Sequence, residues 1–124
     1  MKILIADDEA YIRMLLEQTL EELEDFGVEF LFAENGMEAL EVIENEKPDL
    51  VLLDVMMPLM NGIEVCTKVK KGLAPETYII LLTAKGQEID RHLGKEAGAD
   101  AYLTKPFDPD ALMTTVRKIL QLPF

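Results

Sequence analysis

Short apolar runs alternate with amphipathic segments along the chain. Five of the runs predict β-strands, because they are rich in Ile, Leu and Val and too short for typical helices. These runs are Lys2–Ala6, Val28–Ala33, Leu50–Asp54, Tyr78–Thr83 and Ala101–Thr104. Several of them are apolar at nearly every position, which is typical of strands in a parallel sheet that is covered on both faces.

Between the strands, apolar residues recur at the spacing of helices. In the first such segment, apolar residues from Ile12 to Leu23 share one helical face, and Gly27 can end the helix in the left-handed conformation. In the second, Asn35 and Glu38 have the spacing of a capping pair. These signals predict two well-formed helices in the first half of the chain.

The third and fourth helices have weaker signals. The third is predicted from about Ile63 to Lys71, with Gly72 after its end. The fourth is predicted near Gln87–Ala97, where Gly94 interrupts the pattern. Its inner face is marked only by Ile89, Leu93 and Ala97.

The fifth helix has a clear start, with Asp108 as its N-cap and Pro109 in its first turn. Apolar residues from Leu112 to Leu120 then mark its inner face. Strands and helices that alternate five times imply right-handed crossovers and a doubly wound α/β sandwich. We therefore expect one domain over residues 1–124.

The composition narrows the classes of function. The chain has 124 residues, of which 49% are hydrophobic, and its 24 acidic and 12 basic residues give a net charge of −12. Such a surface repels nucleic acid and anionic membranes, so we expect no direct binding to either. The one cysteine excludes a disulfide within the chain and a zinc cluster. We find no signal peptide and no apolar segment of about 20 residues, and expect a cytoplasmic protein.

Polar and charged residues follow the carboxyl ends of four predicted strands, the edge where open α/β sheets form their sites. These residues are Asp7, Asp8, Asp54, Thr83 and Lys105, and the apolar Ala84 follows Thr83 at the same edge. Three carboxylates at one edge repel one another unless a cation lies between them. Oxygen ligands without His or Cys favour a hard ion, so we expect Mg²⁺ with several bound waters.

Each of these residues also has a purely structural interpretation. Asp7 and Asp8 can cap the first helix, and this alternative stays open when the pair is taken alone. Taken singly, Lys105 fits a surface lysine, Thr83 a β-branched strand residue and Asp54 a turn residue. These alternatives weaken together, because all of them require polar groups to gather at the same edge by chance.

Four motifs appear in chain order on the expected elements. They are Asp7-Asp8, the segment Asp54-Val55-Met56-Met57-Pro58 with Asn61-Gly62, Thr83-Ala84, and Lys105-Pro106-Phe107. Together they resemble the receiver domain of two-component response regulators, and the resemblance covers essentially the whole chain. It implies the flavodoxin-like receiver fold, with five helices and five parallel strands in the order 2-1-3-4-5. It also implies a cis bond between Lys105 and Pro106.

The resemblance implies roles for the acidic residues. Asp54 would accept a phosphoryl group from a sensor histidine kinase or a phosphotransfer protein. Asp8, Asp54 and the main-chain carbonyl of Met56 would ligate Mg²⁺, and Asp7 would act through a water molecule. Phosphoryl transfer to a carboxylate needs this neutralisation of charge on the phosphoryl oxygens.

The resemblance also implies how the phosphoryl group would be sensed. Lys105 would pair with it, and the Thr83 hydroxyl and the Ala84 amide would contact its oxygens. Thr83 would then move toward the phosphoryl group, and Tyr102 would rotate into the vacated space. The face of the fourth helix, fifth strand and fifth helix would change its affinity for a partner. Without these motifs, Tyr102 would be interpreted as a half-buried strand aromatic.

These expectations describe a stand-alone signalling phosphoacceptor that catalyses only its own phosphorylation and slow hydrolysis, and not a metabolic enzyme. A phosphatase of the haloacid-dehalogenase type is a second class, but its D-x-D pattern is replaced here by Asp7-Asp8-Glu9. A binding module that signals without phosphorylation would often lack an acid or the lysine. Nucleotide binding is disfavoured because no glycine-rich phosphate loop follows the first strand. The downstream role is left open between binding to a motor or an enzyme, a phosphorelay, and service as the receiver of a larger regulator. A phosphorylation-dependent dimer is left open too.

Overall fold

The structure is a computed structural model that describes residues 1–84 and 88–123, and its five strands form one parallel sheet. The strands are β1 (Lys2–Ala6), β2 (Glu29–Ala33), β3 (Leu50–Asp54), β4 (Tyr78–Ala84) and β5 (Ala101–Lys105). The helices are α1 (Ala10–Leu20), η1 (Glu21–Phe26), α2 (Gly36–Glu46), α3 (Gly62–Lys68), η2 (Val69–Leu73), α4 (Glu88–Ala97) and α5 (Pro109–Ile119). The strand order β2-β1-β3-β4-β5 confirms the predicted doubly wound α/β fold.

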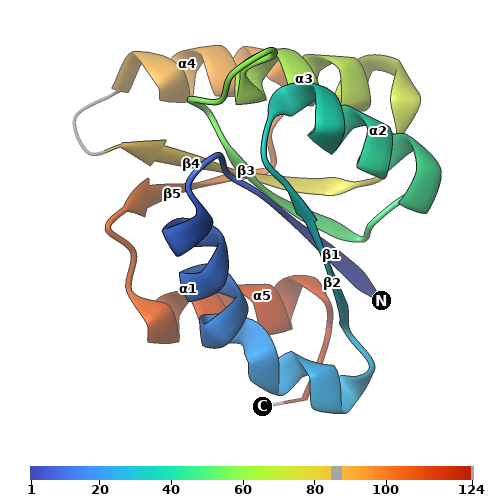
Figure 1. Ribbon diagram of the computed structural model, residues 1–124, viewed down its shortest axis with the longest axis vertical. Helices are drawn as coiled ribbons and strands as arrows, with labels where there is room; N and C mark the ends of the chain where they lie inside the picture. Colours follow the sequence, from blue (N-terminus) through green and yellow to red (C-terminus); the bar gives the residue numbers. More distant parts are fainter. Residues whose placement is uncertain (85–87, 124) are drawn as a thin grey trace.

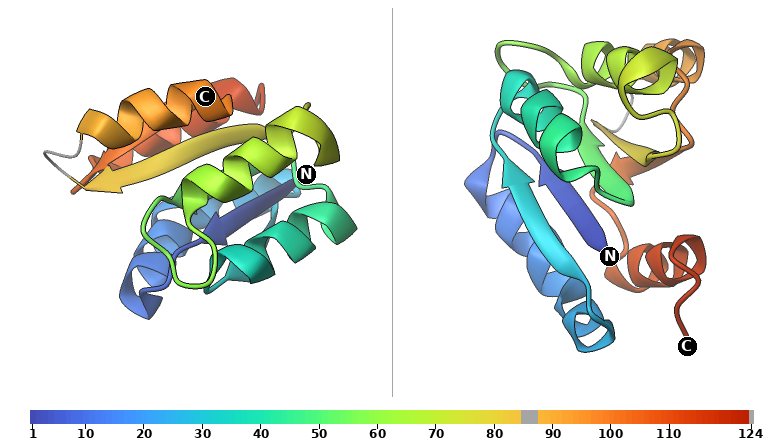
Figure 2. Two further views of the ribbon diagram at one scale, coloured as in Figure 1. Left: turned by 90° about the horizontal axis from the view of Figure 1, so that it is seen from above. Right: turned by 90° about the vertical axis from the view of Figure 1, so that its right-hand side faces the viewer.

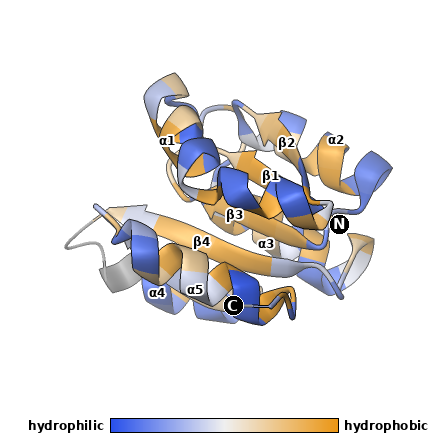
Figure 3. Ribbon diagram, turned by 90° about the horizontal axis from the view of Figure 1, so that it is seen from below, coloured by the Kyte–Doolittle hydropathy of each residue, from blue (hydrophilic) through white to orange (hydrophobic). Residues whose placement is uncertain are grey.

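The helices cover both faces of the sheet (Figures 1 and 2). α2, α3 and α4 pack on one face, and α1 and α5 pack on the other. Successive strand residues alternate between these two cores, so that Leu53 contributes to the first core and Leu52 to the second. β3 is buried at all five positions because it has a strand on each side and helices on each face. Figure 3 shows the resulting apolar strands between helices with polar outer surfaces.

The strand boundaries agree closely with the predicted ones. β1 and β3 agree at both ends, whereas β2 begins one residue later than predicted, at Glu29. β4 and β5 each extend one residue further than predicted, to Ala84 and Lys105. Both extensions lie at the carboxyl edge, because the backbone pairing of these two strands continues through the Ala84–Lys105 pair. No helix in the described part of the chain has both the length and the apolar character needed to cross a bilayer.

Two predicted helices end differently in the structure. α1 changes at Glu21 into the 3₁₀ turn η1, which ends at Gly27 with φ at 86°, so the predicted left-handed end is confirmed. α3 widens into the π-helical turn η2, where the Ala74 amide donates to the Val69 carbonyl at 3.0 Å. The predicted stop at Gly72 is therefore wrong, because this residue lies inside η2.

The fourth helix is described from Glu88, and the predicted start at Gln87 and the side chain of Ile89 lie outside the described residues. The prediction that Leu93 marks the inner face is wrong, because Leu93 is 42% exposed. Gly94 is buried instead.

Gly94 brings α4 close to the sheet. A Cβ atom at this position would lie 2.6 Å from Leu81 Cδ1 and 2.8 Å from Tyr102 Cε1. Ala97, one turn further along the helix, is also small and buried. Gly94 weakens the helical pattern in the sequence, but in the structure its missing side chain lets α4 pack closely against β4 and β5.

The start of α2 joins two loops at the carboxyl edge. The predicted cap is confirmed, since the Glu38 amide donates to Asn35 Oδ1 at 2.7 Å. The Glu38 carboxylate in turn accepts a hydrogen bond from the Glu34 amide at 3.2 Å. The Gly36 amide donates to the Pro58 carbonyl at 3.4 Å, which ties the loop after β2 to the loop after β3.

Candidate functional site

The three acidic residues predicted at the carboxyl edge lie together. One carboxylate oxygen each of Asp7, Asp8 and Asp54 lies within 4.8 Å of the other two. Asp7 follows β1 and Asp54 ends β3, and these two strands are neighbours in the sheet. Asp7 and Asp54 are buried, whereas Asp8 is exposed. The cluster therefore opens to solvent on the side of Asp8.

Asp7 is fixed by hydrogen bonds to its main chain and to both carboxylate oxygens. Its amide donates to the Ala33 carbonyl at 3.1 Å and so extends the pairing of β1 with β2. Its Oδ1 accepts from the Glu9 amide at 2.9 Å, and its Oδ2 accepts from Lys105 Nζ at 2.8 Å. Glu9 is the N-cap of α1 but makes no side-chain capping bond. Within the described residues, the acidic segment therefore does not serve as a side-chain cap of α1.

Lys105 reaches into the acidic cluster from the end of β5. Its Nζ lies 2.8 Å from Asp7 Oδ2 and 3.4 Å from Asp54 Oδ1, and its side chain is 20% exposed. Burial acts to lower the pKa of this ammonium, but the hydrogen bond to Asp7 and the charges of Asp54 and Asp7 raise it overall. Lys105 is therefore not an ordinary surface lysine. The predicted cis bond to Pro106 is confirmed.

The surroundings of Asp54 disfavour its ionised form. Burial, and after it the negative charge of Asp7, raise the pKa of the Asp54 carboxyl from 3.8 to about 6. Lys105 and the Met56 amide, which donates to Asp54 Oδ1 at 3.4 Å, oppose this rise only in part. Three carboxylates against one ammonium leave two excess negative charges. A divalent cation with oxygen ligands fits this donor set.

Thr83 and Ala84 lie beside these residues at the end of β4. The register places Leu82 opposite Asp54, and Ala84 opposite Lys105. Thr83, between them, is 2% exposed, whereas Ala84 is exposed. The sheet therefore brings both predicted residues to the same edge as the acidic cluster.

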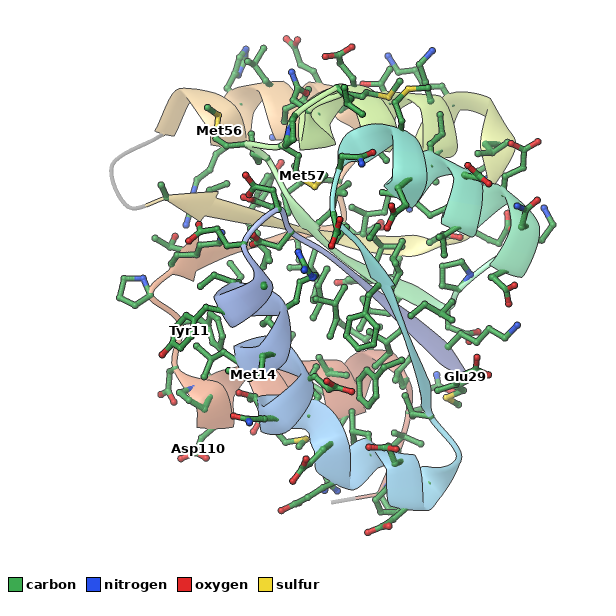
Figure 4. All side chains as sticks on the ribbon, in the orientation of Figure 1. Tyr11, Met14, Glu29, Met56, Met57 and Asp110 are labelled. Atoms are coloured by element: carbon green, nitrogen blue, oxygen red, sulfur yellow. The ribbon has the colours of Figure 1, made fainter. Side chains whose placement is uncertain are left out.

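The loop after β3 forms one wall of the site. Met56 is 63% exposed and lines an open depression together with Asp8, Met57, Pro58 and Asn61. Figure 4 shows Met56 and Met57 on this segment, next to the carboxyl edge of the sheet.

The return of this loop toward the sheet requires a glycine. The Gly62 amide donates to the Val55 carbonyl at 2.9 Å, and a Cβ on Gly62 would overlap the main-chain carbonyl of Asp54. Only glycine allows this approach. The Asn61-Gly62 pair of the second motif therefore holds the backbone beneath Asp54.

Tyr102 lies away from the acidic cluster, on the side of the sheet covered by α4. The guanidinium of Arg91 lies over the Tyr102 ring, 5.8 Å from its centroid, and donates to Thr104 Oγ1 at 2.9 Å. The Tyr102 hydroxyl is buried and has no hydrogen-bond partner within the described residues. The Tyr102 ring thus projects from β5 and packs against α4.

Arg13 is a site residue that the sequence did not indicate. Its Nη1 donates to the main-chain carbonyl of Asp7 at 2.7 Å, and its Nη2 lies 3.3 Å from Glu34 Oε1. The available signal was its position three residues before Leu16, which places a charged residue beside the inner face of α1.

Comparison with known proteins gives consistent matches over nearly the whole chain. The family model described as response regulator receiver domain matches residues 3–117. The alkaline phosphatase synthesis transcriptional regulatory protein PhoP of Bacillus subtilis is 47% identical over 122 residues, which cover 97% of this chain and 48% of PhoP. The phosphate regulon transcriptional regulatory protein PhoB of Pseudomonas aeruginosa is 46% identical over 120 residues, which cover 96% of this chain and 51% of PhoB.

The similarity extends to solved structures. The response regulator receiver domain protein (CheY-like) from Methanospirillum hungatei is 35% identical, with a TM-score of 0.86, and the match covers 97% of this chain and 93% of that one. The chain spans about half the length of the two curated relatives.

Proposed function

The chain belongs to the response regulator receiver domain family of two-component systems, and from this premise we propose that it is an Mg²⁺-dependent switch phosphorylated on Asp54. The observation that carries the proposal is the joint position of Asp7, Asp8, Asp54 and Lys105 at one edge of the sheet. The raised pKa of the Asp54 carboxyl supports it, because incoming positive charge would relieve the repulsion there.

Asp54 would act as the nucleophile. Its contacts with Lys105 and with the Met56 amide both involve Oδ1, so we assign the attack to Oδ2. A bond forms between this oxygen and phosphorus while the P–N bond of a phosphohistidine breaks. The bonding electron pair goes to the imidazole nitrogen of the donor, and the product is an aspartyl phosphate. In the hydrolysis step, a water oxygen would bond to phosphorus, the bond between phosphorus and Oδ2 would break, and the products would be inorganic phosphate and the free carboxylate.

The metal would be held by Asp8, Asp54 and the Met56 carbonyl. Asp7 would contribute through a water molecule, since both of its carboxylate oxygens already accept hydrogen bonds from Glu9 and Lys105. When bound, Mg²⁺ supplies positive charge that stabilises the developing negative charge on the phosphoryl oxygens.

Three further residues would hold the transferred group. Lys105 Nζ already contacts Asp54 Oδ1 and would pair with a phosphoryl oxygen. The Thr83 hydroxyl and the Ala84 amide would contact the remaining oxygens from the end of β4. All three come from strand ends, so their main-chain positions are set by the sheet before the reaction, while the side chains can still adjust.

The proposed output is a change at the face formed by α4, β5 and α5. Thr83 would move toward the phosphoryl group, and Tyr102 would rotate inward. The buried Tyr102 hydroxyl supports this proposal, because it has no hydrogen-bond partner within the described residues and an unpaired buried hydroxyl is unfavourable where it lies.

The partner implied upstream is a sensor histidine kinase or a phosphotransfer protein. Downstream, the two curated relatives are transcriptional regulators, so we propose that this receiver controls a DNA-binding partner domain. A net charge of −12 disfavours DNA contacts by the receiver itself, and we propose that it acts in the cytoplasm.

Phosphorylation can be tested by incubating the protein with acetyl phosphate, in Mg²⁺ or in EDTA, and measuring intact mass. We expect one phosphoryl group, only in Mg²⁺, and none on Asp54→Asn. The matched control is Asp100→Asn, because Asp100 also pairs with a lysine, Lys70, at 2.6 Å. This control should label like the wild type.

Two outcomes would contradict the proposal. Absence of labelling in the wild type would do so, as would unchanged labelling of Asp54→Asn. Catalytic turnover of a metabolite phosphate would instead favour a phosphatase.

A further inference from the structure

Arg13 joins two loops at the edge of the proposed metal site. One guanidinium nitrogen donates to the main-chain carbonyl of Asp7, and another reaches Glu34 in the loop before α2. The Arg13 side chain is 16% exposed, whereas that of Glu34 is 67% exposed. An ion pair with an exposed partner contributes little, so the contact with the Asp7 carbonyl is the stronger one.

The Asp7 carbonyl belongs to the peptide bond that leads to Asp8. The amide of Asp7 is fixed by β2, and its carboxylate by Glu9 and Lys105. Arg13 holds the remaining polar group, the carbonyl, and so fixes the direction in which the chain enters Asp8. Asp8 is itself exposed, so its position depends on this backbone.

We propose that Arg13 is a positioning residue that increases the Mg²⁺ affinity of the site by holding the Asp7–Asp8 peptide in place. This inference rests on the proposed function, because it assumes that Asp8 is a metal ligand. In this proposal the Arg13 guanidinium itself contacts neither the metal ion nor the phosphoryl group.

The sign of the effect distinguishes positioning from simple electrostatics. Arg13 places a positive charge near the acidic cluster, so Coulomb repulsion alone would make Mg²⁺ bind more tightly once that charge is removed. Positioning has the opposite consequence, because a freed Asp7 carbonyl lets Asp8 move away from its binding geometry. Loss of groups that orient metal ligands typically costs about 10-fold or more in affinity.

The test is a calorimetric titration of the intact chain with Mg²⁺, using Arg13→Gln and Arg13→Lys. Arg117→Gln is the matched control at the opposite edge of the sheet. The Arg117 side chain is 15% exposed, donates to the Pro123 carbonyl and lies 3.6 Å from Glu22 Oε2. Like Arg13, it donates to a main-chain carbonyl and faces an exposed glutamate, and it also lies over the Phe26 ring, 5.4 Å from the centroid.

We expect Arg13→Gln to weaken Mg²⁺ binding about 10-fold, and Arg117→Gln to leave it unchanged. Arg13→Lys keeps the charge and can reach one acceptor, so its affinity should lie between those of Arg13→Gln and the wild type. In labelling by acetyl phosphate, Arg13→Gln should raise the half-saturating Mg²⁺ concentration by the same factor. The rate at saturating Mg²⁺ should stay near that of the wild type.

Unchanged or tighter binding by Arg13→Gln, while the wild type binds Mg²⁺, would overturn the role of Arg13 and leave the proposed function intact. Equal weakening in Arg13→Gln and Arg117→Gln would also overturn it, because general loosening would then explain the effect. Absence of Mg²⁺ binding by the wild type would overturn the proposed function and this inference together. If Arg13→Gln does not fold, Arg13→Lys decides by the same criteria.

Discussion

Replacing Asp54 by Asn should make the metal-free protein more stable at neutral pH. Asn has nearly the same shape as Asp but carries no charge, and the Asp54 side chain is 8% exposed. The pKa of the Asp54 carboxyl is raised from 3.8 to about 6, by burial and by the charge of Asp7. At about 1.4 kcal/mol for each pKa unit, the ionised carboxylate costs about 3 kcal/mol of stability. This value is an upper limit, because Lys105 loses one of its partners in the variant.

The pH dependence follows from the direction of the pKa change. Above a pH of about 6 the carboxyl is ionised in both the folded and the unfolded state, so the whole cost is present. As the pH falls below 6, the folded protein binds a proton before the unfolded chain does, and stability is regained. Below the unfolded pKa of 3.8 both states are protonated, and the cost disappears. The advantage of Asp54→Asn should therefore be largest above pH 6 and shrink toward pH 4.

The assay is urea unfolding, followed by far-UV circular dichroism in EDTA, at several pH values between 4 and 8. Asp100→Asn serves as the control, since Asp100 accepts a hydrogen bond from the Ile79 amide and forms an ion pair with Lys70, so its replacement should reduce stability. If Asp54→Asn is no more stable than the wild type at pH 7.5, or if the difference does not vary with pH, the reasoning is refuted. Added Mg²⁺ should stabilise the wild type and not Asp54→Asn.

Three further predictions concern packing. Burial raises the pKa of the Cys66 thiol to about 11, so a disulfide reagent at pH 8 should modify it only in urea; rapid reaction of the native protein would contradict this. Gly94→Ala should lower the free energy of unfolding by about 1–3 kcal/mol through overpacking. Gly72→Ala is its control: among the described residues, no atom outside its own stretch of chain lies within 4 Å of the added Cβ, and a loss of equal size there would refute the packing argument. Gly36→Ala should lower the Tm more than Gly94→Ala, because its Cβ would overlap the main-chain carbonyl of Met60; an unchanged Tm would argue against this contact.

The fold could be predicted because its strongest signals are local. The nearly continuous apolar strands indicate a covered parallel sheet, and the caps at Asn35 and Asp108 lie within three residues of the amides that they bind. The π-helical turn η2 could not be predicted, because the helical pattern continues through it. The role of Gly94 was also hidden, since its contacts come from β4 and β5.

The arrangement of the site could be predicted in part for a similar reason. Parallel strands all end at the same edge, so the sequence alone brings Asp7, Asp54 and Lys105 together once the strands are recognised. The contacts of Arg13 could not be predicted in this way. One partner is a main-chain carbonyl, and the other is a side chain 21 residues away in a different loop. The pattern of side chains along a helix carries no information about such backbone acceptors.

The burial of β3 determines which parts of the domain can open locally and exchange their amide protons. The amide protons of Leu50 to Leu53 should exchange with deuterium only when the whole domain unfolds, because no smaller opening exposes a strand enclosed on four sides. The loops that carry Asp8 and Met56 are exposed and can open at a much lower free energy. If Asp54 is phosphorylated as proposed, the added group would therefore meet a rigid strand beneath it. The surrounding segments at the carboxyl edge would rearrange while β3 stays in place.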